Sequence, residues 1–238
     1  MTEQAATPRD RIVDALMTLA AEQPWNDIEI GDIAQEANVT LAEFRDAFPS
    51  KGAVLAGLAR RIDKAVLEGT SDDLAEEPAR ERLFDVLMRR LDAMAPYKRA
   101  LRRIAFALRS DPLSMLALNG VGLNSMRFML AAANISAEGP LGRLKIQGTV
   151  IAFANTLETW FTDDDPAQAR TMARLDREIR RGERFMERAE DARRLTAPIR
   201  ALGQALFEGV RGSGRRRRER ERHRRDRDDD LADPAAAI

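Results

Sequence analysis

The chain has 238 residues, of which 44% are hydrophobic and 33% charged, so it carries enough apolar material for one large or two small domains with a buried core. It has no cysteine, which excludes disulfides and thiolate metal sites, and its first residues lack the charged-then-apolar layout of a signal peptide. No apolar run approaches the roughly 18 to 20 residues that a membrane span requires. We therefore expect a cytoplasmic protein that does not cross a bilayer.

The net charge of zero, from 39 Lys plus Arg and 39 Asp plus Glu, hides an uneven distribution along the chain. Residues 1–64 carry seven basic and eleven acidic side chains, which is the wrong sign for a polyanionic partner. Residues 78–110 carry nine basic and three acidic side chains, and residues 215–227 carry nine Arg and three acidic residues. Either basic segment could meet phosphate or an acidic lipid surface.

Helix signals dominate from the N-terminus onward, and no convincing alternating strand pattern occurs, which predicts an all-α fold. Thr7, Pro8 and Asp10 supply an N-cap, a first helical residue and an acidic third residue, so a helix should begin there and end before Pro24. Its apolar stripe comprises Ile12, Val13, Leu16, Leu19 and Ala20.

Residues 31–50 have the layout of a helix-turn-helix, two short helices joined by a tight corner at Asn38 and Val39. Thr40 and Glu43 form a capping box that starts the second helix, and Pro49 ends it. Helical spacing turns one set of residues inward: Ile33, Ala34, Ala37, Val39, Phe44 and Phe48. It leaves another set facing outward, where DNA bases would be contacted: Leu41, Ala42, Arg45 and Asp46.

A fourth helix should begin after Ser50 and run to Gly69, with Val54, Leu55, Leu58, Ile62, Val66 and Leu67 on one face. Prolines and glycines then divide the chain into helices near 79–94, 97–109, 113–133, 141–162, 166–189 and 196–210. From residue 212 the sequence is Arg-rich and then Asp-rich, with almost no apolar residue, which predicts disorder.

The motifs Asp32-Ile33-Ala34, Ala37-Asn38-Val39-Thr40 and Phe48-Pro49-Ser50-Lys51 resemble the TetR family of bacterial transcriptional repressors. The resemblance implies an N-terminal three-helix helix-turn-helix domain and a larger C-terminal helical bundle, in a homodimer that a ligand regulates. On this basis we expect a DNA-binding domain at 1–50, a linking helix at 51–68, a ligand-binding and dimerisation domain at 69–211 and a disordered charged tail at 212–238.

The resemblance also suggests which residues contact operator DNA. Thr40 and Arg45 are expected to contact DNA, Leu41 or Ala42 to contact a thymine methyl group, and Lys51 to approach a backbone phosphate. Arg45 and Ala47 depart from the family, which commonly has Tyr at the first position and His or Tyr at the second. The lost aromatic hydroxyls mean lost phosphate contacts.

The central and C-terminal segments support an alternative function. Residues 90–97, 156–165 and 171–176 are similar to segments of the TetR-like lipid-binding accessory proteins of ubiquinone biosynthesis, which share the fold without acting as repressors. The alternative to a ligand-responsive transcriptional regulator is therefore a non-enzymatic lipid-binding protein. Bound isoprenoid without sequence preference on DNA would favour that alternative.

A small apolar effector or lipid is expected in the larger domain. Its central helices carry Met and aromatic residues, which suit an ordinary core equally well as a cavity lining: Met115, Met126, Phe128, Met129, Phe153 and Trp160. Of these, Met115, Met126, Met129, Phe153 and Trp160 are the ligand-binding candidates. Gly120 and Gly122 within a helical pattern suggest close helix packing or a kink beside a cavity.

The segment 97–109 is a basic amphipathic helix, but within a globular chain its apolar stripe should face the core, so contact with a membrane surface is not favoured. Catalytic motifs are missing, since the single His223 lies in the tail and no phosphate loop or metal-spaced acidic cluster occurs. We expect neither an enzyme nor a cofactor. Asp163, Asp164 and Asp165 precede a helix start, where capping explains them better than metal binding.

Overall fold

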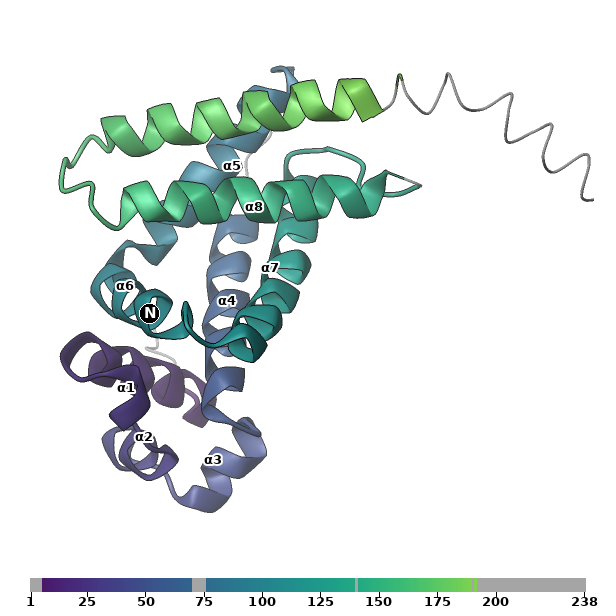
Figure 1. Ribbon diagram of the computed structural model, residues 1–238. Helices are drawn as coiled ribbons and strands as arrows, with labels where there is room; N and C mark the ends of the chain where they lie inside the picture. Colours follow the sequence, from purple (N-terminus) through teal and green to yellow (C-terminus); the bar gives the residue numbers. More distant parts are fainter. Residues whose placement is uncertain (1–5, 70–75, 140, 190, 192–238) are drawn as a thin grey trace, which may run out of the picture. The chain divides into compact units, whose positions relative to one another are not determined.

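The computed structural model describes residues 6–69, 76–139, 141–189 and 191. The chain divides into two compact units, residues 1–184 and 185–238, and the sites described below lie in the first. Within the described ranges the secondary structure is helical and no strand occurs, which confirms the expected all-α class (Figure 1).

Helix α1, Pro8–Glu22, begins and ends where the sequence predicts. The Thr7 hydroxyl accepts a hydrogen bond from the Asp10 N–H at 3.2 Å, and Pro8 occupies the first turn, where a missing N–H has no cost. Ile12 and Leu16 are fully buried. A 3-10 turn, η1 (Trp25–Asp27), follows and buries Trp25.

Helices α2 (Ile30–Glu36) and α3 (Leu41–Ala47) pack against α1 and form the predicted helix-turn-helix. Helix α4, Lys51–Glu68, is capped by the Ser50 hydroxyl and ends at Gly69, as expected. Figure 1 shows α4 running from the helix-turn-helix to the helices that follow it, and α4 packs on α1, α5 and α7. It therefore connects the N-terminal helices to the rest of the unit.

Gly57 allows α4 to approach the helix-turn-helix core closely. A Cβ atom at this position would lie 2.7 and 2.8 Å from two ring atoms of Phe48, which is almost fully buried. A Cβ atom at Gly52, also on α4, would meet only the Ser50 hydroxyl oxygen at 3.9 Å, an ordinary van der Waals contact. The close approach at Gly57 thus depends on the missing side chain.

We expect Gly57→Ala to lower the free energy of unfolding by about 1 kcal/mol, because the overpacking penalty of about 1–3 kcal/mol exceeds the gain of about 1 kcal/mol in helix propensity. Gly52→Ala, the control on the same helix, should leave stability unchanged or raise it. Urea unfolding of both variants measures the difference. Equal effects of the two substitutions would mean that Phe48 relaxes freely.

The larger helical part follows the predicted order, with boundaries within about three residues. Its elements are α5 (Ala79–Met94), the 3-10 turn η3 (Ala95–Tyr97), α6 (Lys98–Leu108), α7 (Pro112–Ala132), α8 (Gly142–Trp160) and helical residues 169–189. Helix α6 turns Ala100, Ile104 and Leu108 inward and packs on α1, while Arg99 and Arg102 are exposed. The apolar stripe of this basic helix faces the core, as predicted.

The helix expected from residue 166 begins at 169 instead. The Asp165 carboxylate accepts the Ala167 N–H at 2.9 Å, and Gln168 adopts a φ of +50°, so the chain makes a turn before the helix starts. Asp163 accepts the Thr171 N–H at 2.9 Å and its hydroxyl at 2.7 Å. Asp163 therefore has the capping role expected of the acidic run, and Asp165 closes the turn before the helix. The predicted helix 196–210 and tail 212–238 lie outside the described residues.

A buried ion pair joins three helices of the unit. The guanidinium group of Arg90 on α5 donates to the carboxylate of Asp63 on α4, and both side chains are only 7% exposed. Ser125 on α7 donates its hydroxyl to the other carboxylate oxygen of Asp63 at 2.8 Å. Arg90 also lies over the ring of Phe153 on α8, 5.6 Å from its centre. Burial lowers the pKa of Arg90, and Asp63 opposes that shift.

Candidate nucleic-acid interface

The corner between α2 and α3 rests on Asn38, whose φ of +49° is in the left-handed region that Asn tolerates better than most residues. The Val39 N–H donates to the Ala34 carbonyl at 3.0 Å and closes the turn. Ile33, Ala37 and Phe44 are buried on either side of it, as the helical spacing predicted. The packing against α1 therefore fixes the angle at which α3 projects.

The start of α3 has the predicted capping box. The Thr40 hydroxyl accepts the Glu43 N–H at 3.1 Å, and the Glu43 carboxylate accepts the Thr40 N–H at 2.7 Å. Hydrogen bonds from the Thr40 backbone and hydroxyl lower the pKa of Glu43. The carboxylate is thereby engaged in its own helix, although its charge remains on the exposed surface.

We expect Glu43→Gln to unfold at a lower temperature than the wild type at pH 7, and we expect the difference in Tm to shrink as the pH is lowered to 3. A carboxylate whose pKa is lowered in the folded state stabilises it above the unfolded pKa, and that contribution is lost as the pH falls through the folded pKa. Ordinary glutamate titrates at about pH 4, so the loss should fall at and below that value. A difference in Tm that persists unchanged at pH 3 would contradict the expectation.

The outer face of α3 is open. Leu41 is 62% exposed, and Ala42, Arg45 and Asp46 are exposed with it, as is Thr40 at the cap. Within the described residues Arg45 makes no ion pair or hydrogen bond. The residues predicted to face outward are therefore exposed to solvent, and Arg45 is an unpaired cation among them within the described residues.

The Lys51 side chain is half-buried and points toward the protein. Its ammonium group donates to the carbonyls of Trp25 and Ile28 at 2.6 and 2.7 Å and lies 4.3 Å from the centre of the Trp25 ring. Burial lowers its pKa, against the influence of Asp27 and Glu29. An ammonium group has three donor hydrogens, so Lys51 retains at most one for a phosphate. Its main role in this structure is to fasten the start of α4 to η1.

Arg9 is exposed but also has partners within the motif, since it donates to the Ala47 carbonyl at 3.0 Å and stacks over the Phe48 ring. At the other end of the motif, α2 begins with Glu29 and Asp32, whose carboxylates occupy a capping box where a bound phosphate would otherwise meet free N–H groups. The motif thus has the shape of a DNA-reading unit but offers few free cations.

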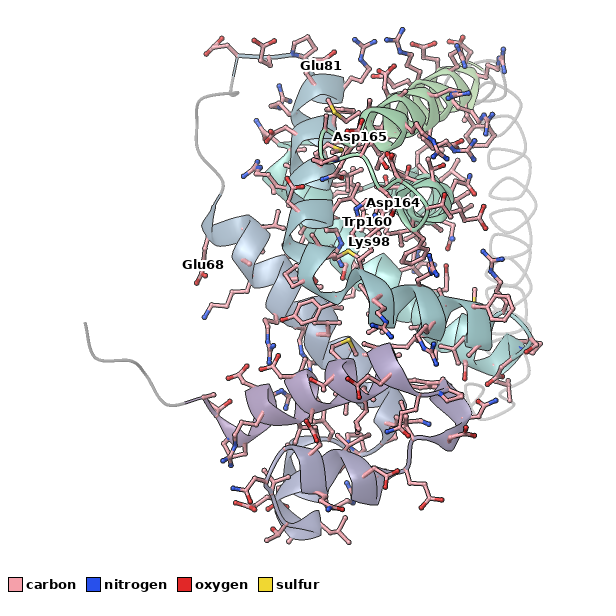
Figure 2. All side chains as sticks on the ribbon, turned by 90° about the vertical axis from the view of Figure 1, so that its left-hand side faces the viewer. Glu68, Glu81, Lys98, Trp160, Asp164 and Asp165 are labelled. Atoms are coloured by element: carbon pink, nitrogen blue, oxygen red, sulfur yellow. The ribbon has the colours of Figure 1, made fainter. Side chains whose placement is uncertain are left out.

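The ligand-binding candidates lie in different places. Met126, Met129, Phe153 and Trp160 are buried in the core, whereas Met115 is 44% exposed. None of the five lines any of the three hollows identified on the described part of the chain. Figure 2 shows Lys98 beside Trp160: its ammonium group lies 5.2 Å from the indole ring and donates to the Asp163 carbonyl at 2.6 Å. The structure therefore places most of this set in ordinary packing.

Within the part of the chain that the structure describes, no group of three His, Cys, Asp or Glu is arranged to hold a metal ion. No described helix has the length and apolar character needed to cross a bilayer.

Sequence reasoning missed the Asp63–Arg90 pair and the contacts of Arg61. Arg61 donates to the Asp10 carbonyl at 2.8 Å and to its carboxylate at 3.1 Å, and it also pairs with Asp14, which fastens α4 to α1. A signal existed for the buried pair, because Asp63 and Arg90 both fall on the apolar stripes of their helices. A charge at such a position predicts a buried partner.

Comparisons with known proteins identify the fold. No protein-family model matches the sequence, and no curated protein matches it significantly. Among solved structures, a TetR transcriptional regulator from Nitrosomonas europaea ATCC 19718 superposes with a TM-score of 0.60 and 23% identity, covering 74% of this chain and 98% of that one. A TetR transcriptional regulator from Rhodococcus sp. RHA1 superposes with a TM-score of 0.56 and 15% identity, covering 74% and 95%. Identities this low show a shared fold, the TetR-like fold expected from the sequence.

Proposed function

We propose that this chain, which has the fold of TetR transcriptional regulators, binds operator DNA through α3 and regulates transcription. The observation that carries the proposal is the open outer face of α3, where Arg45 has no partner among the described residues. Arg can donate two hydrogen bonds to the edge of a guanine, and exposed Leu41 or Ala42 suits a thymine methyl group. Thr40 at the helix start is the remaining candidate contact.

The charge distribution predicts weak binding to DNA of arbitrary sequence. Arg9 is exposed but shares its guanidinium group with the Ala47 carbonyl, Lys51 keeps at most one free donor, and Glu43 and Asp46 lie on the helix that enters the groove. Each phosphate that a protein neutralises adds to the salt dependence of its affinity. We therefore expect a shallower salt dependence than for a regulator that makes about 6 to 10 phosphate contacts.

The test is fluorescence anisotropy with a fragment of the promoter of its own gene and a shuffled fragment of equal length, over a series of salt concentrations. We expect the promoter fragment to bind on the order of 10³-fold more tightly than the shuffled one. Equal affinity for both fragments, or no binding to either, would overturn the proposal.

We further propose that two copies pair as a homodimer, so that two α3 helices meet half-sites about 34 Å apart. Ile151 on α8 and Met172 on the following helix are 53% and 40% exposed, and exposed apolar side chains on both helices support an interface through them. In this scheme residues 1–50 bind DNA, 51–68 link, 69–211 bind an effector and dimerise, and 212–238 form the charged tail. The protein would act in the cytoplasm.

The alternative is a non-enzymatic lipid-binding accessory protein with the same fold. It is favoured by the acidic surface of the N-terminal helices and by the exposed apolar side chains of α7, among them Leu113 and Leu116. Mass spectrometry of the purified protein under native conditions separates the two functions. Co-purified isoprenoid together with no sequence preference on DNA would support the alternative.

A further inference from the structure

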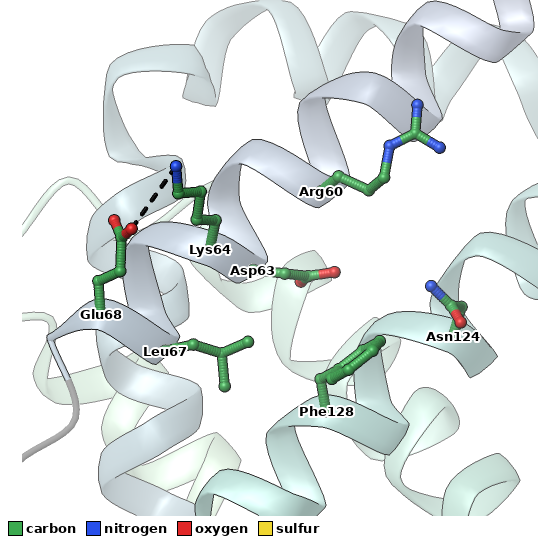
Figure 3. Close-up of a pocket in the computed structure, with 7 residues that line it drawn as sticks. All are labelled: Arg60, Asp63, Lys64, Leu67, Glu68, Asn124 and Phe128. Carbon is green, nitrogen blue, oxygen red and sulfur yellow. Dashed lines mark ion pairs between the residues drawn. The ribbon is translucent and has the colours of Figure 1, made fainter.

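A furrow runs between α4 and α7 on the surface of the first unit. Two adjoining hollows of about 590 and 340 Å³ share Arg60, Asp63 and Asn124 as lining residues. In the larger hollow, Leu67 from α4 and Phe128 from α7 reach toward the same space, with Asn124 beside them (Figure 3). These volumes lie in the range of binding sites for small molecules. We call this feature the α4–α7 furrow.

The wall that α7 contributes is apolar over most of its length. Leu113 and Leu116 are 80% and 69% exposed, and Phe128 is 46% exposed. Ala117 and Gly120 fall on the same helical face and line the smaller hollow. A helix that faces water normally carries charged residues on its outer face, whereas the only charged residue of α7 is Arg127. An apolar face of this kind marks a binding surface.

The wall that α4 contributes to the larger hollow carries the cations Arg60 and Lys64 and the carboxylates Asp63 and Glu68, and among these only the charge of Arg60 is uncompensated by an ion pair. Within the described residues Arg60 makes no ion pair, whereas Lys64 pairs with Glu68 at 3.6 Å and Asp63 pairs with Arg90. Burial, followed by repulsion from Arg60, lowers the pKa of Arg9, so a second cation lies within electrostatic range. A negatively charged group at this place would relieve that repulsion.

We propose that the α4–α7 furrow binds an anionic amphiphile, a single molecule with a carboxylate head and a hydrocarbon tail. The head lies at Arg60, with Lys64 one turn away on the same side of α4. The tail lies along Leu67 and Phe128. The Asn124 amide, which lines both hollows, can donate to the head group.

The interior of the bundle offers less room for such a ligand. Met126, Met129 and Trp160 are almost completely buried, and the centre between α4, α5 and α7 is filled by Asp63, Arg90 and their hydrogen-bond partners. A ligand there would have to displace a buried ion pair. The furrow, in contrast, opens to solvent and needs no displacement.

A ligand in the furrow would contact the helix that holds the DNA-binding motif. Helix α4 begins directly after the motif and is fastened to it by Lys51 and by the close packing of Gly57 on Phe48. A molecule inserted between α4 and α7 can alter the angle of α4 and, in a dimer, the separation of the two α3 helices. This regulatory step rests on the proposed function, whereas binding in the furrow does not.

Isothermal titration calorimetry of the full chain tests the site with two probes below their critical micelle concentrations, sodium dodecanoate and dodecyltrimethylammonium. We expect dodecanoate to bind at least tenfold more tightly than the cationic probe. Arg60→Ala should weaken dodecanoate binding at least tenfold, and Asn124→Trp, which fills the furrow from an exposed position, should abolish it. Arg127→Ala is the matched control, an exposed arginine on α7 that does not line either hollow, and should change nothing.

Circular dichroism establishes that each variant is folded, and Gly120→Leu is a second blocking variant, because a side chain at Gly120 meets open space. Three results would overturn the proposal. The cationic probe could bind the wild type as tightly as dodecanoate does, Arg60→Ala could bind dodecanoate as tightly as the wild type, or both blocking variants could bind dodecanoate with unchanged affinity. The proposal would also be overturned if the wild type does not bind dodecanoate and Asn124→Trp dissociates a dimer. The furrow would then be an interface between copies.

The regulatory step is measured separately, by adding dodecanoate to the complex with promoter DNA. We expect the affinity for the promoter to fall at least tenfold in the wild type and to stay unchanged in Arg60→Ala. Because the calorimetry contains no DNA, failure of the chain to bind any promoter would leave the ligand result standing and refute only the regulatory function.

Discussion

Replacing Asp63 with alanine is expected to lower the free energy of unfolding by roughly 3–5 kcal/mol, the cost typical of removing one partner of a buried ion pair. Arg90 would be left 7% exposed and without its acid, and Ser125 would lose its acceptor. For a chain of this size each kcal/mol lowers Tm by about 2–4 °C, so Tm should fall by roughly 6–20 °C. Differential scanning calorimetry and urea unfolding measure the change.

The double variant Asp63→Leu with Arg90→Met should recover much of this loss, because apolar side chains of similar volume can replace a buried pair without leaving a charge unpaired. Asp176→Ala serves as the control, since it removes an exposed ion pair with Arg180 that should contribute less than about 1 kcal/mol. If Asp63→Ala costs no more than Asp176→Ala, water reaches Arg90 in the folded state and the pair is not a structural link between α4 and α5.

The same ion pair explains a limit of what could be predicted from the sequence. Periodicity places Asp63 and Arg90 on buried faces of their helices, but residues 27 positions apart can meet only if α4 and α5 pack at that height. Local patterns do not contain that information, because it depends on how the helices cross. The pairing of Arg61 with Asp10 on α1 was missed for the same reason.

Local signals were sufficient for the helix-turn-helix. The capping box of Thr40 and Glu43, the left-handed corner at Asn38 and the stop before Pro49 depend on residues at most a few positions apart. Such chemistry is decided within one turn, so the sequence predicts it well. The open face of α3 followed from the same periodicity.

For Lys51, the sequence predicts the position in the helix but does not determine the contacts of the side chain. Its position at the start of α4 was predicted, and its resemblance to a phosphate-contacting lysine suggested that it faces outward. The structure turns it toward the carbonyls of Trp25 and Ile28, more than twenty residues earlier in the chain. Both carbonyls accept hydrogen bonds from Lys51, so they compete with any phosphate for its ammonium group. The long-range packing of η1 decides the outcome.

The ligand-binding candidates show a related limit, because Met126, Met129, Phe153 and Trp160 belong to the packed core while Met115 is exposed. Their role as a cavity lining stays a prediction. Met and aromatic residues occur both in packed cores and in cavity linings, so composition could not separate core residues from ligand-binding residues. The furrow instead uses Arg60, Asn124 and Phe128, of which Phe128 alone had been considered. What marks these residues is the failure of α7 to cover its apolar face with charges, a feature that becomes visible only when the exposed side of the helix is known.

Arg45→Ala is expected to weaken binding to promoter DNA by about 5- to 150-fold, the effect of losing one bidentate contact to a base, worth about 1–3 kcal/mol. Because Arg45 is exposed and unpaired within the described residues, Tm should stay unchanged. Base contact and phosphate contact give different results. If Arg45 contacts a base, affinity for the shuffled fragment and the salt dependence stay as they are; if it contacts a phosphate, both affinities fall and the salt slope decreases by about 0.9.

The matched control is again Arg127→Ala, which removes an exposed arginine far along the chain from α3 and should alter neither affinity. A second variant on the same helix, Asp46→Asn, tests the electrostatic argument from the opposite direction, because it removes a carboxylate that phosphate would repel. It should raise affinity for both fragments, most at low salt, since screening weakens the repulsion as salt increases. If Arg45→Ala binds the promoter as tightly as the wild type and Asp46→Asn changes nothing, α3 does not lie in the groove, and the shape of the motif serves a purpose other than DNA recognition.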